Sequence, residues 1–468
     1  MNRFADKHFY ETFLLALVIV LLPSKSLGYI VPFICLGWYM VRSQSGKLFK
    51  KIIFTTIIFF LVVIFYLLLY SSIGVDYLVS NSVVSLITYG SFIFILLING
   101  PFISTEYAYE KYARILSYTV LIQGTVGIFQ FLMVTLTNRF NIIAGDAVQG
   151  TIGLFAFVSE EAGFGNQMFA INMVFFLVFL IPNILIHRRG IVSFLIGLIA
   201  LMMAGVLHVF IGLIFSMLVT LFFFRRNLLF SNIGRLLSAL VLAGLLILPL
   251  GIIFPGVFDT ANVFIKIYQN QDSPKFEIIG QTVKEMPEKY PHVYLVGLGP
   301  GQYVSRAGLM SSGKYFERDV PFFSNTVAEP LKEYAYKIWD FYSSNNSRFG
   351  NSTMHRPYFS LLSIFAEFGL ICFFALLIYL ITLLAKMRKA YLFYRREGQY
   401  QSAYLSFGVG LLLIFILSIS FFDNYLETTQ AIFPGLLLVS AFYKTLLLNT
   451  SEPLPDKVGH KHLQLSRA

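Results

Sequence analysis

Residues 52–71 read IIFTTIIFFLVVIFYLLLYS, a run of twenty residues without one charged side chain. A helix needs about 20 mainly apolar residues to cross the hydrocarbon core of a bilayer. The rest of the chain has the same character, because 57% of its 468 residues are hydrophobic and only 13% are charged. Soluble domains carry about 25% charged residues, which keep their surfaces solvated. The composition therefore predicts an all-α polytopic membrane protein.

Apolar segments recur along the whole chain, and about twelve of them are candidate membrane spans. They lie at 9–23, 28–42, 52–71, 77–99, 114–136, 166–187, 191–206, 207–224, 234–254, 358–385, 402–421 and 430–447. The expected layout is a region of nine helices with an outer loop at 137–165 (1–254), a large loop (255–357), three further helices (358–447) and a tail (448–468).

The basic residues give these helices an orientation. With the N-terminus in the cytoplasm, 22 of the 35 Lys and Arg residues fall in cytoplasmic segments and 2 in short outer loops, while 11 lie in the large loop. Basic residues concentrate on the cytoplasmic side of membrane proteins, and long loops are exempt from this rule. We therefore expect both termini in the cytoplasm and the large loop outside. The net charge of +11 then reflects the lipid bilayer as partner, with no nucleic acid.

The two cysteines, Cys35 and Cys372, lie inside apolar runs at no spacing suited to a metal or a disulfide. We expect neither a metal nor a cofactor. The first apolar run leads directly into a second one without a small-residue cleavage site, which argues against a cleavable signal peptide.

The large loop is nearly neutral, with 11 basic and 10 acidic residues, and it is rich in aromatic residues. Loops of this length usually have a function. Aromatic rings interleaved with polar groups suit the faces of sugars, although such rings also form the core of a loop or collect in the membrane interface. A folded cap without chemistry is the alternative interpretation.

His355 and Arg356 end the large loop directly before a predicted span. A neutral imidazole at this position can accept a proton from a sugar hydroxyl, and the adjacent guanidinium favours the neutral form. Arg356 is also suited to binding a phosphate group. The alternative is an interfacial pair that binds lipid headgroups.

Two further ionisable residues, Glu367 and His208, lie within predicted spans, where such residues are functional candidates by default. Glu367 also fits a structural hydrogen-bond anchor, which we favour, and His208 stands at a helix start or break after Gly205. The GLGPG segment at 297–301 is not followed by the strand–helix unit of a dinucleotide site, so a tight turn is predicted there.

Four motifs follow one another along the chain. They are GTIG at 150–153 with GNQ at 165–167, VGLGPGQY at 296–303, MHRPYFSLL at 354–362 and AEFGL at 366–370. Their order, together with the spacing of the spans, resembles the superfamily of O-antigen polymerases and O-antigen ligases. Each motif alone is weak, and the ordered set covers most of the chain.

The resemblance implies a GT-C-like, membrane-embedded glycosyltransferase of the bacterial inner membrane that works without a metal. Its donor would be an oligosaccharide on undecaprenyl pyrophosphate, and a chain-length regulator protein is a further candidate partner. His355 would act as base or orient the acceptor hydroxyl, with Arg356 as the second catalytic residue, and cations of the periplasmic loop would bind the pyrophosphate. The predicted substrate-binding residues are Lys275, Arg306, Asn166, Gln167, His208 and Glu367.

The chain departs from the family at two positions. Leu207-His208 stands where members often carry Ser-Arg, and Lys275 stands where they often carry an arginine. A lysine still pairs with phosphate as a point charge but loses the bidentate geometry. These departures favour a repeat-unit polymerase over a ligase that transfers glycan to lipid A–core. A lipid-linked oligosaccharide flippase is the third hypothesis, although the chain lacks the internal repeat and the many intramembrane charges expected of a transporter.

Overall fold

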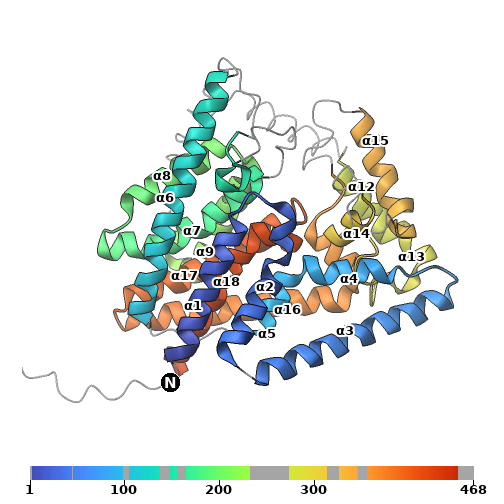
Figure 1. The fold of residues 1–468 in the computed structure, drawn as a ribbon, viewed down its shortest axis with the longest axis horizontal. Coiled ribbons are helices and arrows are strands. Elements are labelled where there is room, and N and C mark those ends of the chain that lie inside the picture. Colours follow the sequence, from blue (N-terminus) through green and yellow to red (C-terminus); the bar gives the residue numbers. More distant parts are fainter. Residues whose placement is uncertain are drawn as a thin grey trace, which may run out of the picture.

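The computed structural model describes residues 3–44, 46–98, 105–137, 147–154, 165–231, 273–313, 326–345 and 356–451. Every regular element within these ranges is a helix (Figure 1). Seven of the described helices are long and apolar enough to cross a membrane. They are α3 (Gly46–Ser72), α6 (Thr105–Thr137), α7 (Gly165–His187), α9 (Leu207–Ser231), α16 (Ser360–Arg396), α17 (Tyr400–Ile419) and α18 (Thr429–Ser451). The chain is therefore a polytopic membrane protein.

The remaining predicted spans form shorter or bent helices. These are α1 (Arg3–Val20), α2 (Lys25–Ser43), α8 (Ile191–Ala204) and the pair α4 (Val79–Thr88) and α5 (Gly90–Leu97), which is bent by 63°. Eleven of the twelve predicted spans thus overlap a helix or this bent pair, whereas 234–254 lies outside the described residues. The prediction of twelve membrane crossings and the layout of the loops stay predictions.

Helices α7, α17 and α18 form the buried centre of the molecule, while α3 and α16 expose most of their apolar surface. A helix that is apolar on all sides is stable when other helices or lipid surround it. Small residues bring the central helices close together. A Cβ on Gly435 of α18, for example, would lie 2.4 Å from the Phe175 ring of α7. Exposed apolar faces such as those of α3 and α16 suit a lipid environment.

The described parts of the large loop form a compact helical unit that lies over the start of α16, at the right of Figure 1. Its elements are α12 (Pro274–Gly280), η3 (Gln281–Glu285), α13 (Met286–Lys289), η4 (Pro291–Val293), α14 (Arg306–Ser311), η5 (Leu331–Tyr336) and α15 (Lys337–Asn345). Tyr290, Tyr303 and Trp339 belong to its buried core. These three rings therefore hold the loop together and are not exposed platforms for sugars.

Candidate functional site

Helix α16 is interrupted at Gly369, where φ is 74° and ψ is 176°. The GLGPG segment, residues 297–301, packs into this interruption, and Gly299 donates its N–H to the carbonyl of Glu367 at 2.9 Å. A Cβ on Gly369 would lie 2.2 Å from the carbonyl oxygen of Leu295. Because φ is positive and the backbones approach so closely, the position requires glycine.

The carboxylate of Glu367 is fully buried and holds the same segment through its backbone. It accepts the N–H groups of Gly301 at 2.7 Å, Tyr303 at 3.0 Å and Ser305 at 3.3 Å. A buried carboxylate is stable when such donors satisfy its oxygens. These contacts are those of the structural anchor favoured from the sequence, and substrate binding by Glu367 stays a prediction.

Helices α3 and α4 hold the segment from the other side. The hydroxyl of Tyr70 donates to the carbonyl of Leu298 at 2.9 Å, and the amide of Asn81 donates to the carbonyl of Gly301 at 3.1 Å. The glycines at 297, 299 and 301 all have positive φ, which confirms the predicted tight turn. Two of the four motifs that carry the family resemblance, those containing GLGPG and AEFGL, are therefore one structural unit, which we call the GLGPG unit.

A second group of contacts brings two predicted cations together beside a carboxylate. The ammonium of Lys275 on α12 donates to the carbonyls of Tyr358 at 3.1 Å and Phe422 at 2.8 Å. The guanidinium of Arg356 lies 3.6 Å from the carboxylate of Asp423. Lys275 and Arg356 are each 8% exposed and Asp423 is 1% exposed. We call Lys275, Arg356 and Asp423 the cation cluster.

The charges within the cation cluster act on one another. The pKa of Lys275 is lowered to about 8. Burial lowers this pKa most, Asp423 raises it and Arg356 lowers it. In the described part of the chain the cluster contains two cations and one carboxylate, so protonation of Lys275 leaves a net positive charge. A net positive charge in a buried site of low dielectric attracts an anion.

His208, Tyr425 and Gln167 form a polar chain next to this cluster. The hydroxyl of Tyr425 donates to Gln167 at 2.9 Å and lies 2.6 Å from Nε2 of His208. Since the hydroxyl proton goes to Gln167, the His208 Nε2 must be the donor, which leaves Nδ1 as an acceptor. His208 also lies within electrostatic range of Asp423 and Lys275. His208 stands at the start of α9 after the break at Gly205, as predicted.

Arg306, a third predicted cation, is fully buried in a separate cluster. Its guanidinium donates to the hydroxyl of Thr428 at 2.9 Å, and its backbone N–H donates to the carboxylate of Glu427. Burial raises the pKa of Glu427, the nearby Glu367 raises it too, and Arg306 lowers it. Arg306 is thus tied to the same chain turn that supplies Asp423.

The last predicted residues are Asn166 and His355. Asn166, in the first turn of α7, donates to the carbonyl of Ala204 at the end of α8, at 3.0 Å. His355 lies outside the described residues, so its predicted role stays a prediction. Its sequence neighbour Arg356 lies in the cation cluster.

Sequence reasoning missed the turn FDNYLETTQ at 422–430, which joins α17 to α18 through η6 (Tyr425–Glu427). Asp423, Tyr425 and Glu427 are all buried in it, and each contacts a predicted residue. The available signal was a short connection between two apolar spans with two carboxylates and no basic residue.

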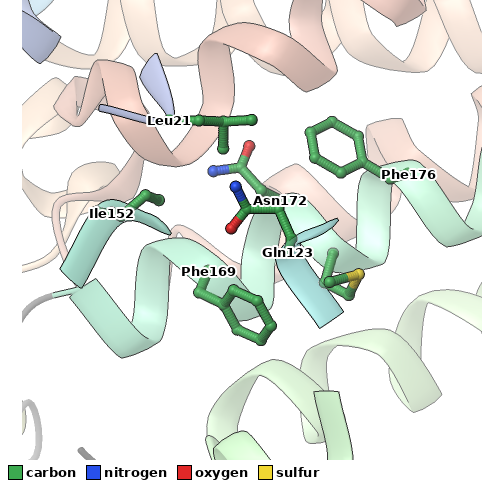
Figure 2. Close-up of a pocket in the computed structure, with 7 residues that line it drawn as sticks. Leu21, Gln123, Ile152, Phe169, Asn172 and Phe176 are labelled. Carbon is green, nitrogen blue, oxygen red and sulfur yellow. The ribbon is translucent and has the colours of Figure 1, made fainter. Parts of the chain in front are cut away.

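Figure 2 shows a narrow pocket between α6, α7 and the 3-10 helix η1 (Gly150–Gly153). The side-chain amides of Gln123 and Asn172 point into it. Gln123 accepts the N–H of Thr151 at 3.0 Å, and the Thr151 hydroxyl donates to the carbonyl of Leu21 at 2.7 Å. The GTIG motif is therefore braced against the end of α1. The pocket is lined by Leu21, Gln123, Ile152, Phe169, Asn172, Met173 and Phe176, none of which is ionisable.

No protein-family model and no curated protein matches this chain. Within the described residues no three His, Cys, Asp or Glu side chains come together in a way that could hold a metal ion.

Proposed function

We propose that the chain is a glycosyltransferase that polymerises the repeat units of a surface polysaccharide such as O-antigen. The observation that supports it is the buried cation cluster, in which Arg356 pairs with the carboxylate of Asp423 and the ammonium of Lys275 is held by the adjacent carbonyl of Phe422. Such a cluster suits a pyrophosphate leaving group, because its two cations outnumber its one carboxylate. Arg356 also directly follows His355, the residue that the family resemblance implies as base.

In the proposed reaction the hydroxyl of an incoming lipid-linked repeat unit attacks the anomeric carbon of the growing glycan. The bond from that carbon to the pyrophosphate oxygen breaks, and undecaprenyl pyrophosphate leaves. His355 takes the hydroxyl proton, while Lys275 and Arg356 stabilise the charge that develops on the leaving group. No nucleotide is needed, because the pyrophosphate is already a good leaving group.

Lys275 is positioned for this role by its backbone contacts. An ammonium has three donors, and the carbonyls of Tyr358 and Phe422 take two of them. The third can reach a phosphate oxygen, in a charge-assisted hydrogen bond of about 1.5–3 kcal/mol. The acceptor atom Nδ1 of His208 and the amide of Gln167 are suited to sugar hydroxyls next to it.

The proposed setting is the bacterial inner membrane, with both termini in the cytoplasm and the cation cluster facing the periplasm. Its residues come from segments that the charge distribution assigns to the outer side, namely the large loop and the α17–α18 turn. A chain-length regulator stays a candidate partner.

The test is to delete the gene, restore it as wild type or variant, and separate the surface glycan on a gel. We expect the deletion to leave one repeat unit on the core without a ladder. His355→Ala and Lys275→Gln should fail to restore the ladder at normal protein levels. Lys284→Gln, which removes an exposed lysine of the same loop, should restore it. A full ladder from Lys275→Gln would remove the cation cluster from the reaction.

The same gel separates the alternatives. If the deletion strain accumulates glycan on the lipid carrier and its core carries no glycan, the protein is a ligase. If the deletion strain has no externalised repeat units, the protein is a flippase. One observation favours the flippase specifically. The bent pair α4–α5 and the interrupted α16 meet near Glu427 and Glu367, because Tyr89 at the bend interacts with both carboxylates. Interrupted helices around buried polar groups are a feature of transporters.

A further inference from the structure

Two lysines come together at the end of the molecule remote from the cation cluster. Lys51 stands in the first turns of α3, and its ammonium donates to the carbonyl of Leu97 at the end of α5, at 3.5 Å. Lys444 of α18 interacts with the charge of Lys51. Because α5 packs against both α3 and α18, the two ammonium groups lie between these three helices and within electrostatic range of one another, and we call them the lysine pair.

The lysine pair has no anionic counterpart among the residues that the structure describes. No carboxylate there lies within ion-pairing distance of either ammonium, and Glu11, on α1, is engaged with Lys7 and Arg42. Lys47 lies one turn before Lys51 on the same face of α3, which adds a further positive charge. Lys444 is half-buried, so solvent screens the repulsion less than it would on an open surface. An anion bound here would relieve that repulsion.

The surface next to the lysine pair is apolar. Phe54 and Ile58, which follow Lys51 by about one and two turns on the same side of α3, are 65% and 44% exposed. A free phosphate ion makes no favourable contact with such a surface, whereas the acyl chains of a phospholipid bury apolar area against it. Basic pockets between the ends of membrane helices are suited to anionic lipid headgroups.

The lysine pair is separate from the proposed catalytic region. Tyr66, whose hydroxyl donates to the GLGPG unit at Val296, lies fifteen residues after Lys51 on α3. At 1.5 Å per residue this is about 22 Å along the helix. Helix α3 makes few contacts along its length, as little of its apolar surface is buried. A ligand at its first turns would hold one end of the helix while the GLGPG unit holds the other.

We propose that Lys51 and Lys444 bind the phosphate group of an anionic phospholipid, whose acyl chains lie along Phe54 and Ile58. The lipid belongs to the leaflet at this end of the molecule, which is the cytoplasmic leaflet in the proposed orientation. It fastens the start of α3 to α5 and α18.

The test uses full-length protein purified in a zwitterionic detergent and titrated with phosphatidylglycerol. Native mass spectrometry counts bound lipids, and thermal unfolding measures the stabilisation. Lys51→Gln/Lys444→Gln should bind phosphatidylglycerol about 25-fold more weakly than wild type, because each lysine near a lipid surface contributes about fivefold. The matched control is Lys386→Gln/Lys389→Gln, which removes two exposed lysines from the end of α16. The control should stay within twofold of wild type.

Two additional variants test the proposal even if Lys51→Gln/Lys444→Gln folds poorly. Lys51→Arg/Lys444→Arg keeps both charges and should bind like wild type, and Lys47→Gln should weaken binding by a smaller factor. Equal loss in the control pair, equal binding of phosphatidylcholine, or weak binding by the arginine variant would overturn the proposal. Stabilisation by inorganic phosphate alone, equal to that by phosphatidylglycerol, would assign the lysine pair to a free anion and would overturn the lipid assignment.

Discussion

Replacing Glu367 by glutamine should loosen the GLGPG unit from α16. The carboxylate accepts three backbone N–H groups, two on Oε1 and one, from Gly301, on Oε2. A glutamine can keep its carbonyl oxygen toward Tyr303 and Ser305, but its NH₂ group then faces the Gly301 N–H donor. One charge-assisted hydrogen bond is lost and a buried donor is left unsatisfied, so the expected cost is about 2–4 kcal/mol.

Thermal unfolding in detergent measures this cost, and limited proteolysis of the large loop shows where the structure loosens. The matched control is Glu277→Gln, which neutralises an exposed carboxylate on α12. The control should change stability by no more than about 0.5 kcal/mol. If both variants melt at the same temperature and resist protease equally, Glu367 is not an anchor. Loss of polymer with unchanged stability would instead support its substrate-binding role.

Three further predictions concern the same region. Gly369→Ala should destabilise the protein by about 1–3 kcal/mol or more in thermal unfolding, because the residue has positive φ and its Cβ would overlap a loop carbonyl. The control is Gly280→Ala, which has open space around its Cβ and should be neutral or stabilising by up to about 1 kcal/mol. Asp423→Asn should lower the free energy of unfolding by about 3–5 kcal/mol, because it removes the carboxylate that pairs with the buried Arg356. A melting temperature equal to that of the wild type would show that the two residues are not coupled. The third prediction concerns pH. Lys275 has a pKa of about 8 in the folded protein, below the usual 10.5. The unfolded chain therefore binds more protons between these values, and the free energy of unfolding should rise with pH across that window by up to about 3 kcal/mol. Polymerisation should fall as pH rises through about 8, and Lys275→Arg should flatten both profiles if the assignment is right.

Hydropathy predicted where the helices lie, because each long apolar run must be shielded from water whatever its neighbours are. It did not predict the 63° bend between α4 and α5. The segment 77–99 is apolar enough to be one span, and the bend places Tyr89 toward residues that come more than 250 positions later. Such a bend depends on tertiary contacts that local composition does not encode.

The grouping of the site was predictable in part. Charge distribution placed Lys275, Arg356, His208 and Gln167 on one side of the membrane, and contacts link all four to the α17–α18 turn. Asp423 was missed because sequence alone gives no distance between this turn and α12. In the chain 147 residues separate Lys275 from Phe422, whose carbonyl it contacts.

The glycine-containing motifs report on backbone packing rather than on chemistry. GLGPG and AEFGL are separate motifs in the sequence, yet Gly297 and Glu367 are in contact. A Cβ on the glycine would lie 2.3 Å from the backbone of the glutamate. The preference for glycine at this place follows from steric contact, and it would be the same for any function of the site.

Reconstitution of polymer synthesis tests the central claim most directly. Purified protein in lipid vesicles is given undecaprenyl-pyrophosphate-linked repeat units in the presence of a metal chelator, and the length of the lipid-linked glycan is followed with time. We predict a growing ladder with wild-type protein and with Lys284→Gln, and single units with Lys275→Gln. Single units from the wild-type protein, or a full ladder from Lys275→Gln, would contradict the assignment of the cation cluster to glycan transfer.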